Sequence, residues 1–274
     1  MPPAGYFVIS AVFHYLGPAF AVLLFTRLDV LGVAWLRIVT AAVVLTAWLR
    51  PWEAWRKLDP RVRRLVIAWA AVLAAMNSAF YLALARLPLG TVAAIEFLPV
   101  IVLAAVAVRT RRNVAALALA VLGVYLVTDV RLVAEPLGLV FAAANAVLFA
   151  AYIVLGDRIA KDDGVAGLDG LALSMLIAAV VALPLGIADA RPAFTDPVLL
   201  AAAAGVGVCS SVIPYVTDQL AMARLPRATY ALMVSILPAT ATVIGVVVLA
   251  QIPSLTEIAG VVLVVSGVAL HRRD

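Results

Sequence analysis

Charged residues are scarce in this chain: only 13% of its 274 residues are Asp, Glu, Lys or Arg, whereas 66% are hydrophobic. A soluble domain carries about a quarter charged residues and about half apolar ones. A soluble fold of this length could not hide so much apolar surface, because too little of its volume is interior. The composition therefore excludes a soluble protein. At about 20 residues a span, the length accommodates roughly ten transmembrane helices.

Residues that build metal and redox sites are also nearly absent. Cys209 is the only cysteine, and the histidines His14 and His271 stand far apart without neighbouring ligands. The chain has no zinc-site spacing and cannot form an internal disulfide. It also contains no hydrolase elbow, phosphate-binding loop, HExxH motif or dinucleotide fingerprint. We therefore expect no metal, no cofactor and no enzyme activity.

The apolar runs predict an all-α integral membrane protein, because they are apolar on every side rather than alternating in polarity as a membrane barrel requires. The predicted spans are residues 6–25, 31–49, 65–85, 89–108, 114–128, 136–155, 168–187, 197–223, 228–250 and 255–270.

Basic residues favour one orientation of these spans. With the N-terminus in the cytoplasm, the side away from the cytoplasm holds only four of the basic residues, namely Arg27, Arg86, Arg131 and Arg191. Most others fall in cytoplasmic segments, as the positive-inside rule requires. We expect a multi-pass protein of the inner (plasma) membrane with both termini in the cytoplasm. Since the cations act as topology signals, the net charge of +5 does not indicate a nucleic-acid partner.

A short motif recurs in the two halves of the chain. Residues 85–88 (Ala-Arg-Leu-Pro) recur at residues 223–226, each time between two apolar spans and ahead of a mid-span proline, Pro99 or Pro238. Because each half holds five predicted spans, the copies must have opposite orientations in the membrane. Inverted repeats of this kind are a recurrent transporter architecture, with substrate bound near the midplane where the halves meet.

Several fragments together resemble one known family. They are residues 31–37 (LGVAWLR), 86–90 (RLPLG), 94–99 (AIEFLP), 151–153 (AYI), 213–215 (IPY) and 224–229 (RLPRAT). In order and spacing they resemble the drug/metabolite transporter superfamily, EamA type, and within it the ten-helix threonine/homoserine exporter-like branch. The resemblance implies two inverted five-helix EamA-type repeats, residues 1–134 and 135–274. It also implies export of amino acids or similar metabolites.

The chain departs from the family pattern in its fourth and ninth spans. Related sequences usually read Phe-Leu-Gly-Pro where this chain has Phe97-Leu98-Pro99. Leu237 stands where a glutamate usually precedes the proline of the ninth span, and Ala250-Gln251 replaces a common Gly-Glu pair. Two family carboxylates are therefore absent, and no proton-coupling role of theirs carries over.

Polar residues at membrane depth are the candidates for a substrate pathway, because burying them there is costly. Glu96 precedes Pro99, which removes a backbone donor and clashes with the carbonyl of Ile95. A carboxylate beside such a distortion suits an amine or a proton, and the structural alternative is pairing with Arg37 or Asn77. Arg37 could bind a substrate carboxylate, act as a structural counter-ion or snorkel to the interface.

The remaining candidates also have two interpretations. His14 could relay a proton or pack as a hydrogen-bonded residue, and the asparagines could join helices or line the cavity. Asp218 could serve the site or form an interfacial salt bridge with Arg224. The tyrosines could form an aromatic wall or anchor helices at the interface. The full candidate set is His14, Tyr15, Arg37, Asn77, Tyr81, Glu96, Asn145, Tyr152, Tyr215 and Asp218.

Together these features favour an exporter that works by alternating access, with a small-molecule substrate and the lipid bilayer as its partners. Any coupling would be to the proton gradient, with Glu96 or His14 as the carrier. A membrane-embedded enzyme or a non-transporting membrane subunit is the alternative. The sequence leaves the oligomeric state open, with a homodimer among the options.

Overall fold

The computed structural model describes residues 3–107, 110–129, 135–161, 167–222, 224 and 236–270, and these contain helices and no strand. The helices are α1 (Pro3–Leu24), α2 (Val30–Leu49), α3 (Trp52–Lys57), α4 (Pro60–Leu84), α5 (Leu89–Ala107), α6 (Arg111–Asp129), α7 (Pro136–Lys161), α8 (Gly167–Gly186), α9 (Arg191–Thr195), α10 (Pro197–Gly207), the π-helix η1 (Val208–Val212), α11 (Ile213–Met222), α13 (Leu237–Leu249) and α14 (Leu255–Leu270). The all-helical prediction is confirmed.

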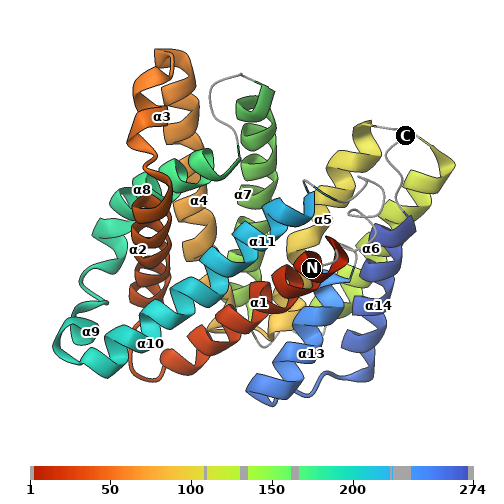
Figure 1. Ribbon diagram of the computed structural model, residues 1–274. Coiled ribbons are helices and arrows are strands. Elements are labelled where there is room, and N and C mark those ends of the chain that lie inside the picture. The colour runs from red at the N-terminus through yellow and green to blue at the C-terminus, as the bar shows by residue number, and fades with distance from the viewer. Residues whose placement is uncertain are drawn as a thin grey trace.

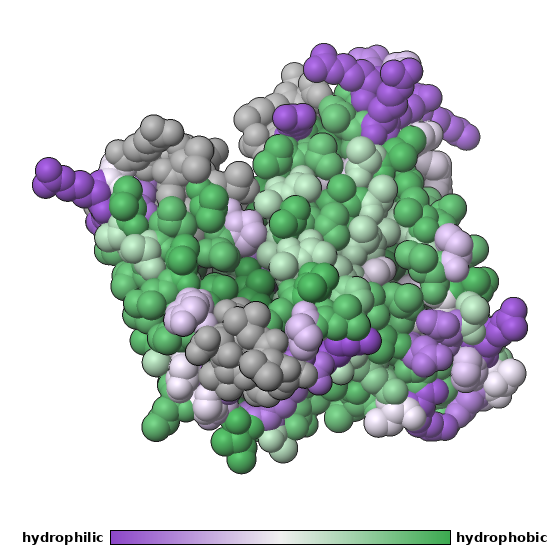
Figure 2. Space-filling view, turned by 180° about the vertical axis from the view of Figure 1, so that it is seen from behind, coloured by the Kyte–Doolittle hydropathy of each residue, from purple (hydrophilic) through white to green (hydrophobic). Residues whose placement is uncertain are grey.

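The surface identifies a membrane protein. Among the described residues, 6 helical stretches are long and apolar enough to cross a membrane, and shorter apolar helices accompany them. Large apolar side chains such as Val43, Val147 and Val247 are exposed, and Figure 2 shows a broad hydrophobic surface with hydrophilic residues gathered at two ends. Exposed apolar area costs about 25 cal/mol per Å² in water, and lipid removes that cost. The number of crossings stays a prediction.

The observed helices follow the predicted spans, with two differences among the described residues. The predicted span 197–223 is broken into α10, η1 and α11 instead of forming one α-helix. The short helices α3 and α9 also lie in connections where the sequence predicted none. The predicted span 228–250 begins outside the described residues, and α13 accounts for its second part.

Helices from the first half of the chain pack against helices from the second half. α2 lies against α8, α5 against α13, and α6 against α14, while α4 packs on α7 and α1 on α11 (Figure 1). Glycines allow the closest approach: a Cβ on Gly123 would lie 2.6 Å from the Gly260 carbonyl oxygen, and one on Gly260 would lie 2.7 Å from that of Gly123. Small residues at such contacts are typical of helix packing in membranes.

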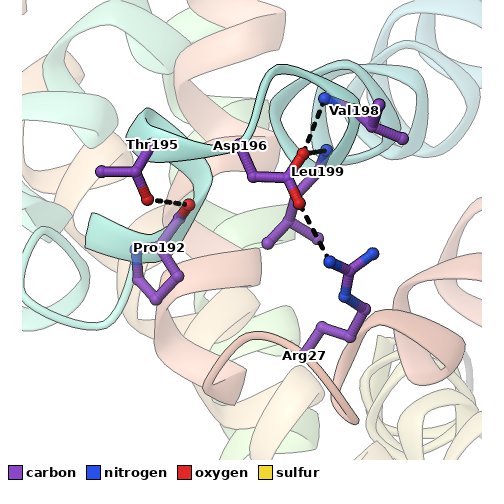
Figure 3. A network of polar contacts seen from close by, with 6 residues as sticks. All are labelled: Arg27, Pro192, Thr195, Asp196, Val198 and Leu199. Atoms are coloured by element: carbon purple, nitrogen blue, oxygen red, sulfur yellow. Dashed lines mark hydrogen bonds and ion pairs between the residues drawn. The ribbon is translucent and has the colours of Figure 1, made fainter.

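Asp196 fastens the turn between α1 and α2 to the start of α10 (Figure 3). Its Oδ1 accepts hydrogen bonds from the backbone N–H groups of Leu199 at 3.1 Å and Val198 at 2.9 Å. Its Oδ2 accepts from Arg27 Nη2 at 2.9 Å. The backbone donors at the helix N-terminus, chiefly that of Leu199, and the Arg27 cation hold the pKa of the Asp196 carboxyl below its usual value of 3.8.

Candidate functional site

Polar side chains from several helices meet inside the bundle and form what we call the central polar cluster. Its members are His14 and Tyr15 on α1, Arg37 on α2, Tyr81 on α4, Glu96 on α5, Asn145 on α7, and Ser210 and Ser211 on η1. The cluster therefore draws on helices from both halves of the chain.

Glu96 is held by an asparagine from the other half. Asn145 Nδ2 donates to Glu96 Oε1 at 3.1 Å, and the two side chains are 0% and 6% exposed, respectively. Asn77, considered from sequence as a partner of Glu96, donates instead to the carbonyl of Leu73 in its own helix at 2.8 Å. A neutral amide on a buried carboxylate leaves the negative charge free to meet a cation or a proton.

Arg37 is buried and does not snorkel to the surface, since only 5% of it is exposed. Its Nε donates to Ser211 Oγ at 2.8 Å, and its Nη2 donates to the Ser210 carbonyl at 3.1 Å. The guanidinium also lies over the Tyr81 ring, 5.3 Å from the centroid, which is within cation–π range. These direct partners are neutral, while the positive charge acts electrostatically on Glu96 as well.

The sequence analysis did not identify Ser210 and Ser211, which hold Arg37, although the nearby Pro214 indicates a distortion of the helix at this place. Proline has no N–H, so Pro214 cannot donate to the Ser210 carbonyl as a regular α-helix would require. Just before it, the chain widens into the π-helix η1, where the Ile213 N–H bonds the Val208 carbonyl. Such π-helical turns occur frequently at functional sites. Here the turn presents the Ser210 carbonyl and the Ser211 hydroxyl to Arg37.

Three buried polar atoms of the cluster have no hydrogen-bond partner in the part of the chain that the structure describes. They are the hydroxyl groups of Tyr15 and Tyr81 and the Oδ1 atom of Asn145. All three residues are fully buried. Because buried polar groups in native proteins nearly always have partners, atoms left free beside two buried charges are suited to contact a ligand.

Other candidates from the sequence lie elsewhere or outside the described residues. Tyr152 stacks on Trp69, with ring centroids 5.0 Å apart, and its carbonyl accepts from the Trp69 indole N–H at 3.0 Å. It therefore joins α7 to α4. Tyr215 is half-buried on α11 and packs against the main core. The side chain of Asp218 lies outside the described residues.

A separate pocket of about 140 Å³ lies at one end of the bundle, between the start of α5 and the turn from α13 to α14. Gln251 lines it, and its Oε1 accepts the Leu89 N–H at 3.0 Å, which caps α5. The preceding Ala250 has a φ of 53°, in the left-handed region that favours glycine. Ala250-Gln251, which stands where related sequences commonly have Gly-Glu, thus keeps a side-chain acceptor for the backbone of α5. It places an alanine, however, in a strained backbone conformation.

Comparison with known proteins finds a family model and individual relatives that are both transporters. The model of the EamA-like transporter family matches residues 136–272. The chain is also similar to the threonine/homoserine exporter RhtA of Escherichia coli strain K12 and of Salmonella typhimurium strain LT2. In each case 29% of 239 aligned residues are identical, which covers 86% of this chain and 79% of the relative.

Proposed function

The chain belongs to the EamA-like transporter family, and we propose that it exports amino acids or similar small metabolites across the inner (plasma) membrane. Membership of this family also confirms the expectation of a transporter rather than an enzyme. The relatives named threonine/homoserine exporters make small polar amino acids the first substrates to test.

The central polar cluster is the observation that carries this proposal. An amino acid is a zwitterion, and the cluster holds one buried cation, Arg37, and one buried carboxylate, Glu96. Arginine offers a planar fork of donors that suits a carboxylate, and Glu96 suits an ammonium group. The free hydroxyl groups of Tyr15 and Tyr81 add neutral contacts for the rest of the substrate.

Alternating access is the mechanism we propose, with residues 1–134 and 135–274 as two inverted repeats. The packing supports it, because α2–α8, α5–α13 and α6–α14 each join corresponding spans of the two predicted repeats. In the α6–α14 pair the contact is reciprocal, since Gly123 and Gly260 each lie against the other's backbone carbonyl. Substrate bound at the cluster would be exposed to one side at a time as the repeats rock.

Proton coupling would use Glu96 or His14. Glu96 touches the neutral Asn145 amide, so it can change its protonation without breaking an ion pair. His14 packs edge-to-face on Tyr15, with ring centroids 5.1 Å apart, and interacts electrostatically with Arg37. Exchange of a proton against the substrate ammonium at this cluster would link export to the gradient.

Ligand-dependent stability of the purified chain tests the proposal. At 100 times its dissociation constant a ligand adds about 2.7 kcal/mol of stability, so a substrate amino acid should raise the melting temperature. Tyr15→Phe and Tyr81→Phe remove only hydroxyl groups that have no hydrogen-bond partner among the described residues, and they should reduce that rise while leaving the ligand-free protein intact. Tyr125→Phe, on the exposed surface of α6, is the control. If no amino acid stabilises the protein the substrate class is wrong, and if both variants respond like wild type the site is wrong.

A further inference from the structure

The connection between α2 and α4, together with the first turns of α4, carries a dense group of exposed cations. These residues, which we call the basic surface, are Arg50, Arg56, Lys57, Arg61 and Arg64. Within residues 50–64, which the structure describes throughout, Glu53 and Asp59 are the acidic residues, so this stretch carries a net positive charge. Figure 2 shows hydrophilic side chains gathered at this end of the molecule, beyond the hydrophobic belt.

The corner that carries these cations is packed onto the rest of the fold. Leu58, Val62 and Val66 are buried in a small core that also contains residues of α7 and α8, and Trp55 packs against it. Arg63 strengthens the corner, because its guanidinium lies 5.4 Å from the Trp55 ring centroid and its Nη2 donates to a backbone carbonyl of α3 at 3.2 Å. The basic surface is therefore built on an ordered corner of the fold.

Two tryptophans place this corner at the level of the lipid headgroups. Trp48, near the end of α2, is 60% exposed, and Trp52, at the start of α3, is 45% exposed. Indole rings prefer the membrane–water interface, because one part of the ring is apolar and its N–H needs a polar partner. Cations beside exposed indoles at the ends of membrane helices are within reach of phosphate groups.

We propose that the basic surface binds the headgroups of anionic phospholipids. An arginine fork matches two oxygens of a phosphate, and several cations together favour a headgroup with a net negative charge over a zwitterionic one. A topology signal needs only charge in the connection; it requires neither a packed helix nor exposed indoles beside the charge. The binding is independent of the transport site, which lies in the bundle interior.

The test compares the full chain in discs of phosphatidylcholine alone with discs that also contain phosphatidylglycerol. We expect phosphatidylglycerol to raise the melting temperature of the wild type and to stay bound to it in native mass spectrometry. The variant R56Q/K57Q/R61Q/R64Q should lose both effects while melting like the wild type in phosphatidylcholine. R191Q, at an exposed position on α9, should keep both. R56K/R61K/R64K keeps the charge but loses the arginine forks, so its phosphatidylglycerol effects should be weaker than those of the wild type and stronger than those of the quadruple variant.

The proposal is overturned if the wild type melts and retains phospholipid identically in the two kinds of disc, or if the quadruple variant keeps the phosphatidylglycerol effects. If that variant does not fold, salt decides the question on the wild type. Ionic strength screens exposed charges, so high salt should remove the rise in melting temperature given by phosphatidylglycerol. A rise that persists in high salt contradicts an electrostatic headgroup site.

Discussion

Arg86 and Arg224 make the same pair of contacts in different halves of the chain. Each donates from Nη1 to the carbonyl oxygen four residues earlier, in the helix that ends just before it, at 3.0 Å and 3.1 Å. Each guanidinium also lies over an aromatic ring, that of Phe141 at 5.3 Å and that of Tyr6 at 5.2 Å. Because Phe141 is on α7 and Tyr6 on α1, the arginine of each motif copy contacts the first helix of the other proposed repeat.

Arg86→Ala and Arg224→Ala should therefore destabilise the protein to a similar degree. Each loses a cation–π contact of about 0.5–2 kcal/mol, and the effects should add in the double variant because separate sites rarely couple. Thermal unfolding of the purified chain measures both. A double variant no less stable than either single variant would show that the contacts are not independent anchors.

Gly17→Ala should be strongly destabilising, because a Cβ there would lie 2.4 Å from Ser210 Cβ and 2.5 Å from its backbone. To relieve that clash, η1 must move away from α1, which would disturb the serines that hold Arg37. Gly205→Ala is the matched control, since a Cβ there meets nothing within 4 Å. It should be neutral or stabilising by up to about 1 kcal/mol through helix propensity. Equal melting temperatures for the two variants would contradict the close packing of α1 on η1.

Ala250→Gly should stabilise the chain by about 1 kcal/mol, because alanine pays roughly that much in the left-handed conformation that this residue adopts. The same exchange at Ala202, exposed within α10, should destabilise by about 1 kcal/mol, because glycine weakens a helix interior. Chemical denaturation of both variants checks the opposite signs. A loss of stability at both positions would mean that Ala250 is not strained.

Acid should weaken the attachment of the α1–α2 turn to α10. The folded-state pKa of Asp196 lies below its usual value of 3.8. The stabilisation of the folded protein by this carboxylate is therefore fully present above pH 3.8, and it is lost as the pH falls through the folded-state pKa. Asp196→Asn keeps an oxygen acceptor for the α10 backbone donors but cannot titrate. Its melting temperature should therefore fall less than that of wild type as the pH is lowered from about 5 towards 3. Parallel curves for the two proteins would rule out Asp196 as the titrating group.

Hydropathy was sufficient to predict where the long apolar helices lie, because in lipid each backbone donor must be satisfied within its own segment. The span predicted at 31–49 is observed as α2, for example. Hydropathy could not predict the break at η1, since Pro214 permits a distortion but its form depends on the helices packed around it. The short helix α3 was missed for a similar reason, because six residues are too few to show a helical period.

Three members of the central polar cluster, Arg37, Glu96 and Asn145, could be recognised from the sequence. Each is a polar residue within an apolar span, where burial is costly. The partners of those residues could not be deduced in the same way. Arg37 and Ser211 are 174 positions apart in the chain, and Glu96 and Asn145 are 49 apart. Only the packing of the helices decides such pairs. Serine is also common enough in membrane helices that Ser210 and Ser211 carried little signal by themselves.

Proton-coupled flux in proteoliposomes tests the central claim most directly. Vesicles that contain wild-type protein should exchange labelled L-threonine or L-homoserine and accumulate it when a pH gradient is imposed. We expect at least one of the variants Glu96→Gln, Glu96→Ala and His14→Ala to abolish accumulation. A variant that has lost only the proton carrier should still exchange the substrate when no gradient is imposed. If all three variants keep gradient-driven accumulation at the wild-type level, the buried cluster around Glu96 is not the coupling site and the account fails.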